Sequence, residues 1–297
     1  MSALKQHPKY GRGEHTIREP GGPSEALASR LRASFRDPGY RPPQLPEVGV
    51  ELLQMSRDPD VDLNRVLKLL ERDALLAASI LRVARSPVFA GSAEVVTLHQ
   101  ALMRLGLSRI TEVVLQTTMN MEVFRAPGYE PTMKALAHHA AVTAHLTRYI
   151  CSASDIPKDY AFLCGLLLNV GISASLSLIA HRRRHPPPVS DIWPTVEELS
   201  PEAGFIVVRS WKLPASVGEV IRLQRQIIVE GNVHRVAAAA SLADGFATEA
   251  GFGPSDAVPV EQGRDTVAYA ARMLRIDEAR LKGLQTRCHE LAKTVEA

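Results

Sequence analysis

Residues 161–172 of this 297-residue chain read Ala-Phe-Leu-Cys-Gly-Leu-Leu-Leu-Asn-Val-Gly-Ile. A run this apolar is typical of a helix that is buried on all sides, and we expect it to lie in a helix from Lys158 to His181. Cys164 suits such a helix as a small buried residue. Asn169 is the exception, because a buried side-chain amide needs hydrogen-bond partners. The stretch therefore predicts a core helix of an all-α protein, with one polar position that bonds across the bundle.

The composition is that of a globular protein with an aliphatic, helical core: 45% of the residues are hydrophobic, 23% are charged and 5% are aromatic. No apolar run is expected to approach the roughly 18 residues that cross a membrane. The N-terminus lacks the apolar centre of a signal peptide. Cys151, Cys164 and Cys288 show no CxxC spacing, which argues against a zinc ribbon or a disulfide framework. We therefore expect a cytoplasmic protein without a membrane span.

Residues 1–44 differ from the rest of the chain in composition and charge. They contain six Pro, five Gly and eight Lys/Arg against four Asp/Glu, a net charge of +4, whereas the remainder carries −1. Such a segment buries too little apolar surface to offset the entropy of ordering, so we predict a mobile basic tail. A short helix is predicted at residues 24–36, where Leu27, Leu31 and Phe35 recur at helical spacing. It either docks on the body or, with its flanking arginines, acts as a membrane-surface or partner-binding helix.

From Leu45 onward, helical periods alternate with breakers, and no sustained strand alternation occurs. Asp62, Asp73 and Thr97 stand where helix N-caps are expected. The predicted helices exceed the usual share of about a third of a globular chain, so the predicted fold class is all-α. They cover residues 47–56, 63–72, 74–85, 99–105, 109–121, 133–151, 158–181, 201–211, 215–230, 233–249, 265–274 and 277–295.

Several short motifs follow one another along this body. They are Leu45-Pro46, Asp73 with Ile-Leu-Arg-Val-Ala-Arg-Ser-Pro-Val-Phe-Ala-Gly at 80–91, Ala-Leu-Met-Arg-Leu-Gly at 101–106, Glu-Ala-Gly at 202–204, Trp-Lys-Leu-Pro at 211–214, and Ile221. Together they resemble the HDOD family, whose name stands for HD-related output domain. Arg85 stands where that family usually carries Asn, and Pro87 is unusual for it. The resemblance implies an HDOD domain at 45–297, with an N-terminal helical part at 45–126 and a degenerate HD-like helical part at 131–297.

HD phosphohydrolases hold metal ions with imidazoles and carboxylates from several helices. The resemblance suggests which residues of this chain stand at those ligand positions. His138 matches the first histidine of the HD arrangement, and Asp244 matches the last aspartate. Leu168 and Asn169 replace the central His-Asp pair. Gln224 and Arg225 stand where HD-GYP enzymes often carry His-His.

The two remaining candidate ligands are too few for a tight transition-metal site, which generally needs three or four. Arg225 adds a positive charge that disfavours a metal ion. We therefore predict neither hydrolase activity nor a metal or other cofactor. Asn169 is expected to bond to His138 or Asp244 as part of a polar network left from the metal site.

The resemblance implies a bacterial regulatory protein that acts in signal transduction by protein–protein interaction. We expect a groove between the two helical parts, with candidate residues Arg82, Arg85, Phe89, His138 and Asn169. Arg225 and Asp244 complete the set of candidate residues in the degenerate pocket.

Two alternatives stay open at this point. The emptied pocket could bind a nucleotide such as a cyclic dinucleotide without cutting it, with Arg85, Arg225 and the basic run at 182–184 contacting phosphates. A phosphodiesterase that uses other ligands is the second. Nucleic-acid binding is not expected, because the body is near neutral and no aromatic residues interleave the basic run.

Overall fold

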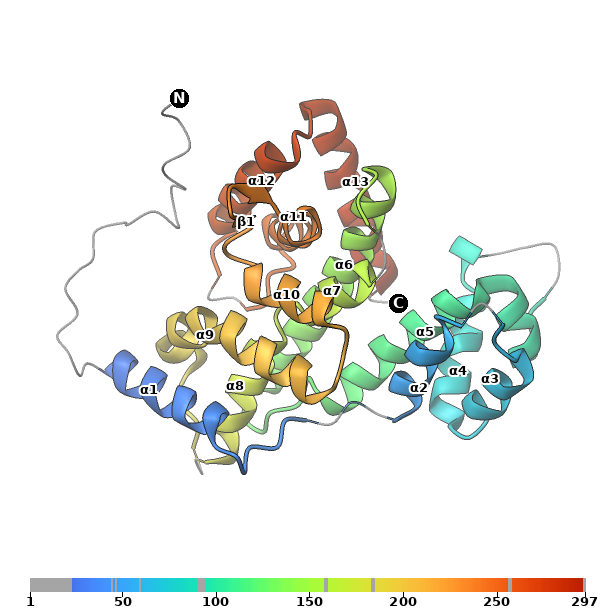
Figure 1. Cartoon of the computed structure of the whole chain (residues 1–297), viewed down its shortest axis with the longest axis horizontal. Helices are drawn as coiled ribbons and strands as arrows, with labels where there is room; N and C mark the ends of the chain where they lie inside the picture. Colours follow the sequence, from blue (N-terminus) through green and yellow to red (C-terminus); the bar gives the residue numbers. More distant parts are fainter. Residues whose placement is uncertain are drawn as a thin grey trace. The chain divides into compact units, whose positions relative to one another are not determined.

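The computed structural model describes residues 23–295, apart from residues 44, 46, 59, 90–93, 158–159, 183–184 and 256–257. Of the mobile tail predicted at residues 1–44, residues 1–22 lie outside the described part. The chain divides into two units, which we call unit 1 (Met1–Pro42 with Phe124–Ala297) and unit 2 (Pro43–Val123). Both are built from helices, which confirms the predicted all-α fold (Figure 1).

Unit 2 shows how well local capping chemistry fixes helix starts. The carboxylate of Asp73 accepts hydrogen bonds from the backbone N–H groups of Leu75 and Leu76, and Thr97 forms a capping box with Gln100. Gly106 interrupts the last helix with a φ of 75°, at the predicted break. The elements are α2 (Glu47–Met55), α3 (Leu63–Leu70), α4 (Ala74–Ala84), the 3₁₀ turn η1 (Pro87–Phe89) and α5 (Leu98–Glu122).

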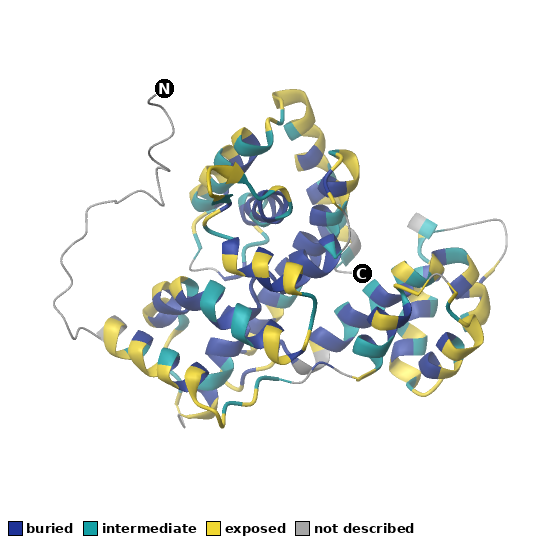
Figure 2. Ribbon diagram, viewed as in Figure 1, coloured by how far each residue is buried: buried dark blue, intermediate teal, exposed yellow. Residues whose placement is uncertain are grey.

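Unit 1 is organised around α11, whose four consecutive residues Ala237–Ala240 have no exposed surface. Their small side chains let neighbouring helices approach closely, and Figure 2 shows α11 as a buried coil in the middle of this unit. The elements are α1 (Pro23–Arg36), α6 (Glu130–Ala153), α7 (Ala161–Leu167), α8 (Val170–His181), α9 (Val189–Ser210), α10 (Ala215–Leu223), β1 (Ile228–Val229), β2 (Asn232–Val233), α11 (Arg235–Glu249), α12 (Val260–Leu274) and α13 (Glu278–Val295).

Helix α1 docks on α9. The apolar face predicted for this helix is buried, because Leu31 and Phe35 are only 4% and 6% exposed. Arg32 pairs with Glu198 at 3.2 Å, and Arg36 pairs with Glu202 at 2.9 Å. Apolar burial therefore holds α1 in place, and the exposed ion pairs add little.

Three predicted helices end or begin elsewhere. The helix predicted at 158–181 is two helices, α7 and α8, with a break at Leu168–Asn169. Helix α9 begins at Val189 rather than near residue 201, because Pro194 and Pro201 lie inside it instead of ending it. The helix predicted at 215–230 stops at Leu223, and a hairpin follows.

The hairpin of β1 and β2 turns at Glu230 and Gly231, whose φ angles are 49° and 80°. Positive φ at both central residues is what a type I′ turn requires, and Gly adopts it without steric cost. The Val-Glu-Gly-Asn-Val sequence at 229–233 carries this signal, although helical periodicity places it at the ends of two helices.

The prediction that no apolar run approaches membrane-spanning length is wrong. Among the described residues, Ala161–His181 is long and apolar enough by length and composition, with a mean hydropathy of 2.0. However, 89% of the 18-residue window that passes this test is buried inside the fold, where α7 packs against α6 and α8 packs against α9. We assign it to the core of unit 1. Cys164 lies within it and is buried, as predicted.

Candidate functional site

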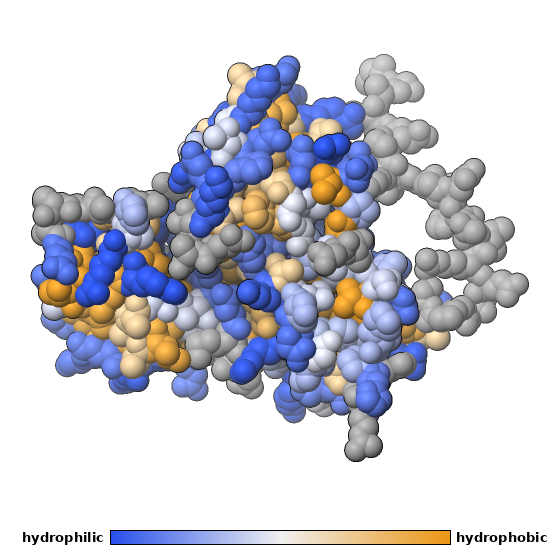
Figure 3. All heavy atoms as spheres, turned by 180° about the vertical axis from the view of Figure 1, so that it is seen from behind, coloured by the Kyte–Doolittle hydropathy of each residue, from blue (hydrophilic) through white to orange (hydrophobic). Residues whose placement is uncertain are grey.

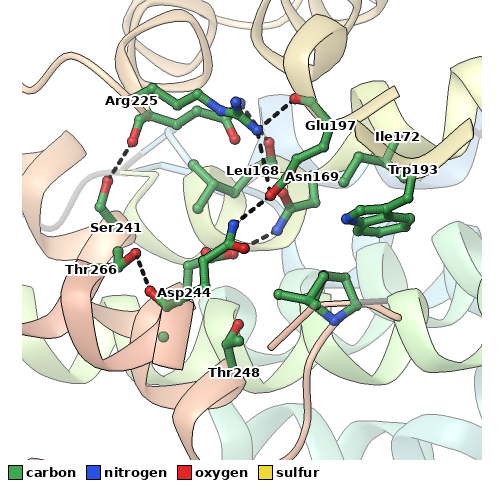
Figure 4. A pocket seen from close by; sticks show the side chains of 15 residues that line it. Leu168, Asn169, Ile172, Trp193, Glu197, Arg225, Ser241, Asp244, Thr248 and Thr266 are labelled. Carbon is green, nitrogen blue, oxygen red and sulfur yellow. Dashed lines mark hydrogen bonds and ion pairs between the residues drawn. The ribbon is translucent and has the colours of Figure 1, made fainter. Parts of the chain in front are cut away.

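Three helices of unit 1 bring three polar side chains together at the break between α7 and α8. Asn169 lies at the break, His139 comes from α6 and Asp244 from α11. The Asn169 amide donates to Asp244 Oδ1 at 2.6 Å, and His139 Nε2 lies 2.8 Å from the same oxygen. The predicted hydrogen bond between Asn169 and Asp244 is therefore present (Figure 4).

The histidine in this cluster is His139, and the prediction that placed His138 there is wrong. Neighbouring residues on a helix point about 100° apart, so only one of the two can face the core. His139 is fully buried, and its Nδ1 lies 2.7 Å from the carbonyl oxygen of Phe252. His138 is half-buried, with its Nε2 3.4 Å from the Ala292 carbonyl oxygen and its ring edge against Phe252.

Both ring nitrogens of His139 face oxygen atoms. A carbonyl oxygen only accepts, so the Nδ1 that faces Phe252 must carry a proton. Oδ1 of Asp244 accepts a hydrogen bond from Asn169. If Nε2 of His139 carried no proton, its lone pair would face a lone pair of this oxygen, which is repulsive. The favourable arrangement is an imidazolium that donates from both nitrogens to a carbonyl and a carboxylate. Neither ring nitrogen of His139 is then free to bind a metal ion.

The electrostatics of Asp244 agree with this assignment. Its side chain is 28% exposed. Burial raises the pKa of Asp244, but the charge and hydrogen bond of His139, the hydrogen bond of Asn169 and the charge of Arg225 together hold it below the ordinary 3.8. Asp244 is therefore the carboxylate partner of a charged His139.

Gln224 provides a hydrogen-bond donor to the backbone at the break between α7 and α8. Its amide nitrogen donates to the carbonyl oxygens of Leu168 at 3.0 Å and Ile221 at 2.9 Å. Ser241 in turn donates to the Gln224 carbonyl at 2.9 Å. Gln224 thus provides a partner to a carbonyl that the end of α7 leaves without a helical one.

Arg225 does the same for α9. Proline has no N–H, so Pro201 cannot bond to the carbonyl of Glu197 four residues earlier. Arg225 donates to that carbonyl at 2.6 Å, and its guanidinium lies 3.6 Å from the Glu197 carboxylate. Gln262 also donates to that carboxylate, at 2.6 Å. Sequence patterns missed Glu197 and Gln262, although a proline within a helix signals a carbonyl that needs another partner.

A pocket of about 50 Å³ lies beside this cluster, and Leu168, Ile172 and Trp193 form its apolar side (Figure 4). Its polar lining includes Asn169, Glu197, Gln224, Arg225, Asp244 and Gln262, and His139 is not part of it. A volume of this size holds a few water molecules, whereas sites for small organic ligands are typically about 300–1,000 Å³. Within the described residues, no group of three or more His, Cys, Asp or Glu side chains is arranged to hold a metal ion. The pocket is polar, small and satisfied by its own hydrogen bonds.

The other predicted site residues lie in unit 2. Arg82 is exposed on α4. Arg85 follows α4, and its Nε donates to the carbonyl of Val95 at 2.6 Å. The Phe89 ring lies under the guanidinium of Arg109, 5.6 Å from its centroid. The predicted groove that would join these residues to His138 and Asn169 stays a prediction.

Comparison with known proteins identifies the family. An uncharacterized protein of Treponema pallidum (strain Nichols) is 26% identical over 216 residues, and the chain spans 41% of that protein's length. A solved protein from Shewanella amazonensis SB2B, provisionally named a metal-dependent phosphohydrolase, is 19% identical with a TM-score of 0.68, covering 92% of this chain and 99% of its own. A provisionally named signal transduction protein from Marinobacter aquaeolei VT8 is 17% identical with a TM-score of 0.60, covering 92% and 64%. At such identities these two structures show a shared fold alone.

The matching family is the HDOD domain, over residues 43–227, which is more than half of the sequence. This match includes α2 to α10, and hence the break at Asn169. It also includes Gln224 and Arg225. The chain belongs to the HDOD domain family.

Proposed function

We propose that this protein is a non-catalytic regulator in signal transduction that acts by binding another protein through its HDOD domain. Exposed apolar side chains on unit 2 carry this proposal. Among the described residues, six large hydrophobic side chains are exposed, and four of them belong to unit 2, which makes up little more than a quarter of the chain. They are Leu63, Leu75, Val96 and Met103, and Met103 is the most exposed at 67%.

Figure 3 shows hydrophobic side chains gathered over unit 2, on the left in this view. Helix α4 contributes through its outer face, where Leu75, Ala78 and Arg82 are all exposed. A helix that is apolar on every side is normally covered. Contiguous apolar surface on a globular protein commonly marks an interaction site.

The degenerate HD site supports the non-catalytic part of the proposal. His139, Asn169 and Asp244 bond to one another, and Arg225 bonds to Glu197. Each of these bonds would have to break before a metal ion could be held. The sensor alternative needs a cyclic dinucleotide to enter the same pocket, and a volume of about 50 Å³ weighs against it.

Affinity capture from native cells with matched variants tests the proposal. We expect Leu75→Asp combined with Met103→Asp to reduce recovery of the partner at least tenfold, because a charge at each position opposes burial in an interface. Val229→Asp replaces an exposed apolar residue of unit 1 and serves as the control. Equal recovery of the same proteins by all three chains, each shown to be folded by circular dichroism, contradicts the proposal.

The sensor alternative has its own measurement. Calorimetric titration of the intact protein with cyclic dinucleotides is expected to give no heat of binding. Saturable binding that Arg225→Gln weakens tenfold would replace the protein-binding proposal with nucleotide sensing.

A further inference from the structure

A second and larger hollow lies in unit 1, between α1 and the adjoining ends of α8 and α9. Its volume is about 450 Å³, within the range of sites that bind small organic molecules. Its apolar walls come from five aliphatic side chains and a proline, Leu27, Leu31, Leu178, Ile179, Ile192 and Pro187. The degenerate HD pocket contributes none of these residues.

This hollow is a groove with an apolar floor and basic residues at its rim. Leu31, Ile179 and Ile192 are 4–5% exposed and form the floor. Arg30 of α1 and Arg182 at the end of α8 are exposed at the rim. Within the described part of the chain, neither guanidinium forms an ion pair with a carboxylate.

The walls of the groove are held by contacts outside it. The hydroxyl of Tyr129, a buried residue, donates to the carbonyl of Pro187 at 3.0 Å. On the opposite wall, the buried Phe35 and its edge contact with Tyr40 hold the far end of α1. The hollow is thus part of the packed structure of unit 1.

We propose that this groove binds an anionic amphiphile, a free molecule with an aliphatic chain of medium length and a terminal carboxylate. The chain would lie on the floor formed by Leu31, Ile179 and Ile192, where burial of apolar surface favours it. The carboxylate would accept hydrogen bonds from Arg30 and Arg182, since a guanidinium matches a carboxylate in geometry and charge. Asp191, the acidic residue at the rim, is exposed to solvent and disfavours an anion less than a buried carboxylate would.

Binding of three ten-carbon probes to the full-length protein tests this inference. Decanoate, decanol and decyltrimethylammonium share the chain and differ in the charge of the head group. By isothermal titration calorimetry below micelle-forming concentrations, we expect decanoate to bind at least tenfold more tightly than either of the others. Equal affinities would overturn the proposal, because the rim would then contribute no charge selectivity.

Variants locate the site. Arg30→Gln with Arg182→Gln is expected to weaken decanoate binding at least tenfold, whereas Arg209→Gln, an exposed arginine on α9 outside the groove, leaves it unchanged. Leu27→Trp, which fills the groove and keeps its charge, should also weaken binding tenfold. Unchanged binding in either variant overturns the proposal.

An anionic membrane surface offers the same two features as the proposed ligand, apolar chains and negative charge. Vesicles of phosphatidylglycerol distinguish this source of anionic lipid from a free ligand. Attachment to vesicles in the absence of any binding of monomeric decanoate would overturn the proposal in favour of a membrane surface. None of these outcomes depends on a protein partner, so the result is independent of the proposed function.

Discussion

His139 and Asn169 meet at a single carboxylate oxygen of Asp244. The resemblance places metal-binding histidines and carboxylates where His138, Leu168, Asn169 and Asp244 lie, whereas in the structure the neighbouring His139 faces Asp244. A metal ion would balance the carboxylate charge. Here the imidazolium of His139 balances Asp244, and the Asn169 amide, with no charge of its own, donates the second hydrogen bond. Loss of the two central ligands is thus compatible with a stable core.

His139→Ala is expected to lower the free energy of unfolding by about 2–3 kcal/mol. It removes the charged partner of Asp244, and breaking a buried ion pair costs roughly 3–5 kcal/mol, which the 28% exposure of Asp244 reduces. His138→Ala, on the adjacent position, should cost less than about 1 kcal/mol, as is usual for a partly exposed residue. Urea denaturation of both variants measures the difference. Equal losses would contradict the assignment of His139 to the cluster.

The sequence indicates the residue types in this site better than their positions. Asn169 could be selected because a lone amide in an apolar helix demands a partner, and Asp244 because the resemblance matches it to the last aspartate of the HD arrangement. The choice between His138 and His139 depends on the rotation of α6 by one residue. Only the packing of α6 against α11 fixes that rotation, so a sequence without its fold leaves both histidines as candidates.

Among the helices, α9 shows how a proline inside a helix creates a specific tertiary contact. Pro201 leaves the Glu197 carbonyl without a helical donor, and Arg225 donates to it from the end of α10 at 2.6 Å. Arg225→Ala is expected to cost about 1–2 kcal/mol, because a largely buried carbonyl loses its partner. In a Pro201→Ala background the loss should fall by about 1 kcal/mol, since an alanine at this position supplies the missing N–H.

A double-mutant cycle measured by chemical denaturation gives this coupling energy. Arg222→Ala, an exposed arginine on α10 three residues before Arg225, is the control and should show no coupling to Pro201→Ala. Strict additivity of Arg225→Ala and Pro201→Ala would contradict the role given to the Glu197 carbonyl.

The crossing of α8 and α9 depends on glycine. A Cβ atom at Gly171 would overlap the carbonyl oxygen of Ser200 and lie 2.7 Å from the backbone nitrogen of Gly204. Both are backbone atoms, so the helices would have to separate, and we expect Gly171→Ala to cost about 3 kcal/mol or more. Gly283→Ala, in the exposed part of α13 with no atom within 4 Å of its Cβ, should instead stabilise by about 0.5–1 kcal/mol. Thermal denaturation of the two variants tests this opposition; destabilisation of equal size in both would refute it.

A helix boundary can be predicted from the sequence when neighbouring residues determine it. It cannot be predicted in this way when it depends on a residue that is distant in the sequence. Asp73 and Thr97 cap helices with their own neighbours, so their roles follow from a few residues. The break after α7 depends on Gln224, 56 residues further along the chain. The start of α9 escapes prediction for a related reason, since a proline is tolerated only when a distant group such as Arg225 satisfies the freed carbonyl.

For the whole molecule, each unit carries a partly buried carboxyl group, and the pKa shifts of the two groups are opposite. In unit 1 the pKa of Asp244 is held below 3.8, so its contribution to stability is complete above that pH and is lost as the pH falls through the lowered value. In unit 2, burial raises the pKa of Glu112 to about 7, although Arg109 at 2.8 Å opposes the shift. The contribution of Glu112 is therefore complete below pH 4.5 and is lost as the pH rises through about 7.

Raising the pH from 5.5 to 8.5 is thus expected to destabilise unit 2 through Glu112, while Asp244 in unit 1 stays ionised throughout. The side chain of Glu112 is 13% exposed, and a shift of this size corresponds to a loss of at most roughly 3 kcal/mol. Amide hydrogen exchange, expressed as protection factors for each unit, measures both responses in one experiment. Glu112→Gln cannot ionise and should remove the pH dependence in unit 2, whereas Glu71→Gln, an exposed carboxyl of the same unit, should retain it. Parallel loss of protection in both units, or an unchanged response in Glu112→Gln, would show that another group governs the pH dependence.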